Sequence, residues 1–174
     1  GGWQAYPLPV ENMGQPHLLE IEYPNDLLQT LGISIVEPNA VGKVVPLGLD
    51  SGVHVMQSAA ADKPRMLRHK LIFWPRTTTP LVLLTNRHDE LPAVFGPIRV
   101  YTGPRTLPPA DAGTGAPQSA RLLAAYFEKP LFPENFSASE AADEGTGRSL
   151  RDWVTFYEGG QRLIEYLKHV GYTG

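Results

Sequence analysis

The sequence predicts an antiparallel β-sandwich or jelly roll with a helical extension at its C-terminal end. Short segments between His17 and Tyr101 alternate apolar and polar residues, and turn residues bound most of them. A period of two is typical of a strand with one buried face. After Gly103 the composition changes to proline, alanine and glycine, and only helical patterns follow. Several short strands at this spacing favour two packed sheets.

Alternation is strongest in residues 17–23, where Leu19 and Ile21 alternate with Glu20 and Glu22. We expect seven antiparallel strands, in residues 17–23, 30–35, 43–49, 53–55, 67–74, 81–84 and 98–101. The predicted core consists of apolar members of these strands: Leu19, Ile21, Leu31, Ile33, Ile35, Leu71, Phe73, Leu83 and Val100.

The C-terminal third reads as a linker followed by helices. Residues 104–118 hold four prolines, a linker composition. Apolar residues at helical spacing predict a helix over 119–128 and a longer one over 149–170. Ser149 is a suitable N-cap, and Gly171 stands where a C-terminal capping glycine belongs.

These patterns divide the chain into three parts. Residues 1–103 form the predicted sandwich, 104–118 the linker, and 119–174 a helical extension. The apolar stripe of the last helix is wide for a surface helix, which favours the start of a downstream domain. The alternative is an ordinary C-terminal helix docked on the sandwich.

Charge and composition argue against several classes of function. Fifteen basic and 18 acidic residues give a net charge of −3, and no basic stripe suits nucleic acid. No apolar run is long enough to cross a membrane. Without cysteine, disulfides, thiolate metal sites and cysteine nucleophiles are excluded.

No recognisable catalytic or metal site emerges from the titratable residues. The five histidines show no metal-ligand spacing; His69 reads as a hydrogen-bonded core residue and His54 as solvent-facing. Ser51 is expected in a turn. One alternative is a structural calcium ion bound by aspartates in the predicted turns, although no calcium-loop motif supports it. These aspartates are Asp26, Asp50 and Asp89.

The candidate binding residues are a polar cluster and the aromatic side chains. Asn86, Arg87, His88 and Asp89 follow a buried strand, which suits a recognition loop as well as an ordinary solvated turn. Indole and phenol rings pack on the apolar faces of sugars. The aromatic residues near strand ends or on outward positions are Trp3, Tyr6, Trp74 and Tyr101. Their alternative role is to cap the edges of the core.

Among the aromatic residues, Trp74 is the first choice, because alternation places it opposite Phe73 and therefore away from the core. The candidate carbohydrate-binding residues are Trp74, Asn86, Arg87, His88, Asp89 and Tyr101.

Four segments of the sandwich region resemble a galactose-binding-like jelly roll: residues 17–24, 29–35, 65–74 and 83–86. The segments 126–136 and 152–163 resemble uncharacterised bacterial glycoside-hydrolase-like proteins, in which a β-sandwich precedes a TIM-type barrel. These matching residues are structural, so no family active-site residue can be assigned here.

The resemblance implies a non-catalytic, ancillary sandwich of a carbohydrate-active protein that is secreted or lies in the cell envelope. Its partners would be a polysaccharide or glycan and the downstream domain of the same chain. Two alternatives stay open: a purely structural or protein-contacting module that braces that domain, and an autonomous enzyme.

Overall fold

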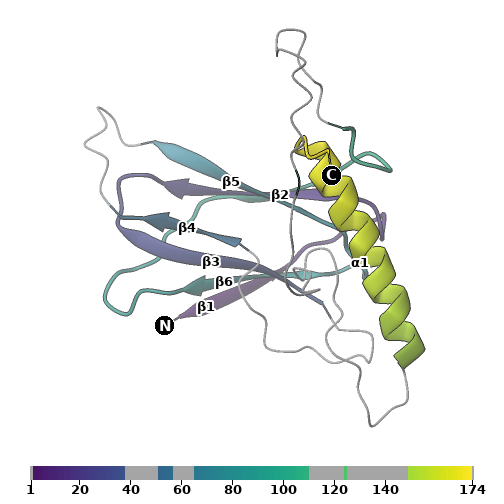
Figure 1. Cartoon of the computed structure of the whole chain (residues 1–174). Coiled ribbons are helices and arrows are strands. Elements are labelled where there is room, and N and C mark those ends of the chain that lie inside the picture. Colours follow the sequence, from purple (N-terminus) through teal and green to yellow (C-terminus); the bar gives the residue numbers. More distant parts are fainter. Residues whose placement is uncertain (1, 38–50, 57–64, 110–123, 125–148, 174) are drawn as a thin grey trace, which may run out of the picture.

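A computed structural model describes residues 2–37, 51–56, 65–109, 124 and 149–173, with the side chains of 149–156 and 158 excepted. Within these ranges the chain is mainly β, with two antiparallel sheets and one C-terminal helix (Figure 1). The strands and helix are β1 (Trp3–Pro7), β2 (His17–Pro24), β3 (Gln29–Val36), β4 (Ser51–Val55), β5 (Met66–Phe73), β6 (Leu81–Asn86), β7 (Ile98–Thr102) and α1 (Ser149–His169).

Six of the seven predicted strands are confirmed as β2 to β7. The seventh, in residues 43–49, lies outside the described residues, as do the helix over 119–128 and most of the linker. Strand β1 was not predicted. It is short, and all five of its residues are exposed, so it lacks the buried face that marks the other strands.

Sheet A has the strand order β1-β6-β3-β4, and sheet B has the order β5-β2-β7. Among the described strands, β3 and β4 are the one consecutive pair in the same sheet. The other connections cross between the sheets, and side chains from both sheets form one buried cluster.

Most of the predicted core is confirmed. The buried cluster comes from β2, β3, β4, β5 and β6 and from Leu8, with Leu71 and Val100 partly buried against it. The exception is Leu83, because Val82 and Leu84 are the buried members of β6. Register explains this: Leu84 lies opposite the fully buried Ile33. When every residue in a strand is apolar, the sequence does not show which of them face the core.

Helix α1 is confirmed, and its end has the predicted glycine cap. Gly171 has a φ of 95°, a conformation that glycine adopts without a Cβ clash. The Tyr172 N–H donates to Leu167 O and the Gly171 N–H to Lys168 O, at 2.9 and 3.1 Å. This pair of bonds is the Schellman arrangement.

The helix packs along one side of the sandwich (Figure 1). Leu163 is buried against Trp74, and Ile72 and Leu167 join the cluster. Tyr157 and Ile164 are exposed, while the side chains of Trp153 and Phe156 are outside the described set. Within the described ranges, no helix is both long and apolar enough to cross a bilayer.

Candidate functional site

The prediction that Trp74 is an exposed aromatic surface for a sugar is wrong. Its side chain is only 3% exposed because α1 covers it with Leu163. Trp74 clusters with Ile72, whose side chain points away from the core, so alternation predicted the right face. It could not predict that a distant helix packs there. A sugar ring cannot stack on an indole that is already covered.

The predicted polar loop is held by its own hydrogen bonds. Asn86 Nδ2 donates to Leu91 O at 2.8 Å, and Asn86 Oδ1 accepts from the His88 N–H at 2.9 Å. His88 Nδ1 accepts from the N–H groups of Glu90 and Leu91, both at 3.2 Å. Two of the four candidates therefore build the loop.

The other two members of the loop, Arg87 and Asp89, are exposed. The Arg87 N–H donates to Thr30 O at 2.9 Å, which fixes the start of the loop on β3. Tyr101, 46% exposed, lies on β7 in the other sheet, opposite Leu18 of β2. The structure therefore separates Tyr101 and Trp74 from the loop.

A cleft of 270 Å³ lies beside the loop and contains Asn86. Its lining residues come from the start of β1, from β3 and β6, and from the segment after the loop: Gly2, Trp3, Gln4, Leu31, Leu84, Asn86, Pro92, Ala93 and Phe95. Trp3 is 70% exposed. We call this the Trp3 cleft.

The wall formed by residues 91–96 is fixed at three points. Gln29 Oε1 accepts from the Val94 N–H at 2.8 Å, and Asn86 holds Leu91 as described. The Gly96 N–H donates to Glu22 O at 2.7 Å. Phe95 also packs edge-on against Tyr6, with ring centroids 6.2 Å apart. Because these contacts lie within the protein, the wall is already in place before any ligand arrives.

Sequence reasoning missed the role of Gln4 and Phe95, and it did not place Trp3 beside Asn86. The signal was weak because strand β1 was not recognised. Once β1 pairs with β6, Gln4 stands opposite the buried Leu84, and Trp3 opposite Thr85. Gln4 therefore lies on the same face of sheet A as Leu84 and stays exposed at the mouth of the cleft, which Trp3 also lines.

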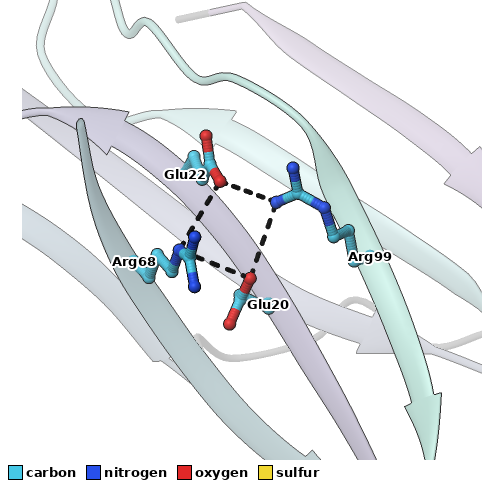
Figure 2. A network of polar contacts seen from close by, with 4 residues as sticks. All are labelled: Glu20, Glu22, Arg68 and Arg99. Carbon is cyan, nitrogen blue, oxygen red and sulfur yellow. Dashed lines mark hydrogen bonds and ion pairs between the residues drawn. The ribbon is translucent and has the colours of Figure 1, made fainter.

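The outer face of sheet B carries an ion-pair network, shown in Figure 2. Glu20 and Glu22 of β2 lie between Arg68 of β5 and Arg99 of β7. Arg99 Nη1 lies 2.7 Å from Glu22 Oε1 and 3.5 Å from Glu20 Oε1, and Arg68 Nε lies 3.5 and 3.7 Å from the same two oxygens. The hydrogen bond and charge of Glu22 raise the pKa of Arg99 above its ordinary value. We call these four residues the charge network.

Two carboxylates on one strand could in principle serve as an acid and a nucleophile. Here both oxygens face guanidinium groups, and Glu20 is only 4% exposed. Each negative charge has a positive partner within the network. This arrangement suits a stable sheet surface better than acid–base chemistry.

Ser51 and His69 form the one side-chain contact that resembles a catalytic dyad. Ser51 Oγ lies 2.5 Å from His69 Nε2, and the bond joins β4 of sheet A to β5 of sheet B. Ser51 begins β4, so its assignment to a turn is wrong. His69 has the predicted hydrogen bond but is only partly buried. Burial lowers the pKa of His69. No orienting carboxylate is bonded to the imidazole within the described ranges, so the pair reads as a link between sheets.

Metal-binding side chains do not gather in the described part of the chain: no three of His, Asp and Glu there are placed to hold an ion. Asp50 lies outside the described residues. His54 is exposed as expected, with Nδ1 2.9 Å from Thr30 Oγ1.

No protein-family model matches the chain, and comparisons with curated proteins and with solved structures find no significant match.

Proposed function

We propose that this chain is a non-catalytic, ancillary β-sandwich module of a larger carbohydrate-active protein, and that it binds carbohydrate weakly at the Trp3 cleft. A galactose-binding-like jelly-roll type and a location outside the cell or in its envelope belong to the same proposal. The mainly β fold and the resemblance of the sequence support it.

One observation carries the proposal: Trp3, which is 70% exposed, lines a fixed cleft that the predicted loop residue Asn86 also lines. Aromatic rings bind the C–H faces of sugars with little entropic cost, because few torsions must be frozen. A wall that is fixed in advance further reduces the ordering cost of binding.

The polar groups near the rim suit hydroxyl recognition. Gln4 lies at the mouth, and the exposed Arg87 and Asp89 stand on the adjoining loop. Asn86 was predicted to bind carbohydrate directly, but the oxygen and the nitrogen of its amide both hold the loop. It acts as a positioning residue.

The test is a calorimetric titration of the chain with a panel of soluble polysaccharides and oligosaccharides. We expect Trp3→Ala to weaken binding at least tenfold, because it removes the stacking surface while leaving every described hydrogen bond of the cleft wall. Tyr101→Ala is the matched control, since Tyr101 is an exposed aromatic residue on the other sheet.

The Tyr101→Ala variant should bind as tightly as the unchanged chain. Absence of binding to every carbohydrate at millimolar concentration would refute the proposal. Equal loss in both variants would show that the Trp3 cleft is not the site.

A specific observation favours a second candidate, a structural module that braces a downstream domain. Tyr157, Ile164 and Val170 of α1 and its C-terminal cap are exposed, while Leu163 holds the helix on the sandwich. A helix with one apolar face docked and other apolar side chains exposed can contact another domain. Solvent protection of Tyr157 and Ile164 in a longer protein, without glycan binding, would support this second candidate.

A further inference from the structure

Two sheet edges flank a second cleft, of 390 Å³, on the side of the sandwich where β1 and β7 end their sheets. Its lining is Tyr6, Pro7, Leu8, Pro9, Ile98 and Val100. The Tyr6 hydroxyl already donates to Gln4 Oε1. The cleft is therefore apolar in character and differs from the Trp3 cleft.

The backbone of β7 leaves one set of groups without a strand partner in the described residues. The Gly103 N–H donates to Pro16 O at 2.9 Å and Pro97 O accepts from the Glu22 N–H at 3.2 Å. Antiparallel strands turn alternate residues toward each neighbour. Residues 97, 99, 101 and 103 therefore face β2, and Ile98, Val100 and Thr102 direct their N–H and C=O groups to the open edge.

The edge of β1 differs from that of β7. The Asn86 N–H donates to Gly2 O at 2.8 Å and the Leu8 N–H to Pro80 O at 2.7 Å, so even-numbered residues face β6. The open edge of β1 accordingly presents odd-numbered residues, which include Pro7 and then Pro9. Proline has no N–H to donate, and it is a common means of protecting an edge strand from unwanted pairing.

We propose that the open edge of β7 binds an extended strand from a partner polypeptide, whose alternate side chains are apolar and uncharged. The partner's backbone pairs antiparallel with Ile98, Val100 and Thr102. Its apolar side chains enter the 390 Å³ cleft, where the side chains of Ile98 and Val100 already lie. This is peptide recognition by strand addition.

The occupant is an extended strand for two reasons. Only a continuous backbone can pair with successive groups along an edge, which a glycan cannot do. A strand added at β7 also brings the three described strands of sheet B to four, the number that the structure describes in sheet A.

A second copy of this chain fits less well. If two copies paired through β7, the inward side chains of each β7 would still point into their own sandwich. Neither copy would supply side chains to fill the cleft of the other. A partner strand without a sandwich of its own has free apolar side chains for this purpose.

The test uses the full chain and the capped synthetic peptide Lys-Val-Thr-Val-Thr-Val-Lys, with amide hydrogen exchange followed by nuclear magnetic resonance. In the free chain, the N–H groups of Ile98, Val100 and Thr102 should exchange faster than those of Arg99 and Tyr101. Added peptide should slow exchange at Ile98, Val100 and Thr102 at least tenfold.

Two modified peptides test the pairing without changing the protein. Directly opposite residues share a face, so the valines pair with Ile98 and Val100 and direct their N–H groups to β7. N-methylation of the valines should weaken binding at least tenfold. N-methylation of the threonines, whose N–H groups point to solvent, should leave the affinity unchanged.

A protein variant adds an independent measurement. Val100→Pro removes an N–H that does not face β2, so the sandwich should fold and the peptide affinity should fall at least tenfold. The proposal is overturned if the peptide leaves exchange at Ile98, Val100 and Thr102 unchanged, or if both methylated peptides bind equally. It is also overturned if those amides are protected in the absence of peptide and their protection increases with the concentration of the chain. A second copy of the chain would then be the occupant.

Discussion

The outer face of sheet B and the Trp3 cleft both contain polar side chains, but they use them differently. In the charge network, Glu20, Glu22, Arg68 and Arg99 neutralise one another on the surface they occupy. At the Trp3 cleft, the hydrogen bonds of Asn86 and Gln29 fix a wall of backbone instead. Trp3, which lines the same cleft, is left 70% exposed.

This difference shows why a count of polar residues is a poor guide to a binding site. A polar group whose partners lie within the protein contributes to stability and leaves little for a ligand. A polar group that fixes a wall next to an exposed aromatic ring prepares a surface for a ligand. The comparison predicts that substitutions in the two regions will separate stability from binding.

The largest effect is expected for Gln29→Ala. Gln29 is almost fully buried, and it accepts from the Val94 N–H and donates to Pro24 O. Its removal leaves two backbone groups unpaired and a small cavity, so we expect a loss of about 2 kcal/mol in unfolding free energy. Because the cleft wall loosens, glycan affinity should fall as well.

Denaturant unfolding and calorimetric titration measure both effects of Gln29→Ala. The control is Gln161→Ala, since Gln161 is exposed on α1 and its amide donates to the hydroxyl of Tyr157, which is exposed as well. The distinction between the two regions would fail if Gln29→Ala lowered stability and left glycan affinity intact, because the wall would then have no part in binding.

A smaller effect on stability alone is expected for Glu20→Ala. Glu20 is buried between Arg68, whose side chain is 61% exposed, and Arg99, whose side chain is 39% exposed. Its loss leaves Glu22 alone to balance both, and screening by water limits the cost to about 1 kcal/mol. Glu11→Ala changes an exposed carboxylate and should have no measurable effect. Glycan affinity should be unchanged in both variants, and a drop in affinity with Glu20→Ala would mean that sheet B takes part in binding.

The strands with clear alternation could be predicted from the sequence, and the residues buried by distant segments could not. In β2 and β3, alternation fixed both the element and its inward face, and the predicted core residues there are buried. Local pattern alone was insufficient for Leu83, whose apolar run lacks a phase, and for Trp74, which a helix from far along the chain covers.

The candidate site was predictable only in part, for a related reason. The polar loop was recognised because its residues are adjacent in the sequence. The Trp3 cleft depends on the pairing of β1 with β6, which brings residues 3 and 85 together. Strand pairing over such a separation leaves no mark on a short exposed strand, so its role became visible only in the structure.

The smallest effect concerns the inner side of sheet B, where His69 bonds to Ser51. Burial lowers the pKa of His69 below its ordinary value of 6.5. Between that lowered value and 6.5, the unfolded chain binds more protons than the folded chain. The stability that neutral His69 allows is therefore full above about pH 6.5, and it is lost as the pH falls toward the lowered pKa of His69. Ile21 lies opposite His69 on β2, Leu67 and Leu71 flank it on β5, and from β4 the uncharged Ser51 faces it. In denaturant unfolding at pH 7 and pH 5, His69→Gln should lose less stability on acidification than the unchanged chain, whereas His54→Gln, at an exposed position, should lose as much. If all three proteins lost the same stability between pH 7 and pH 5, protonation of His69 would not affect folding, and its position on the inner face of sheet B would matter no more than the exposed position of His54.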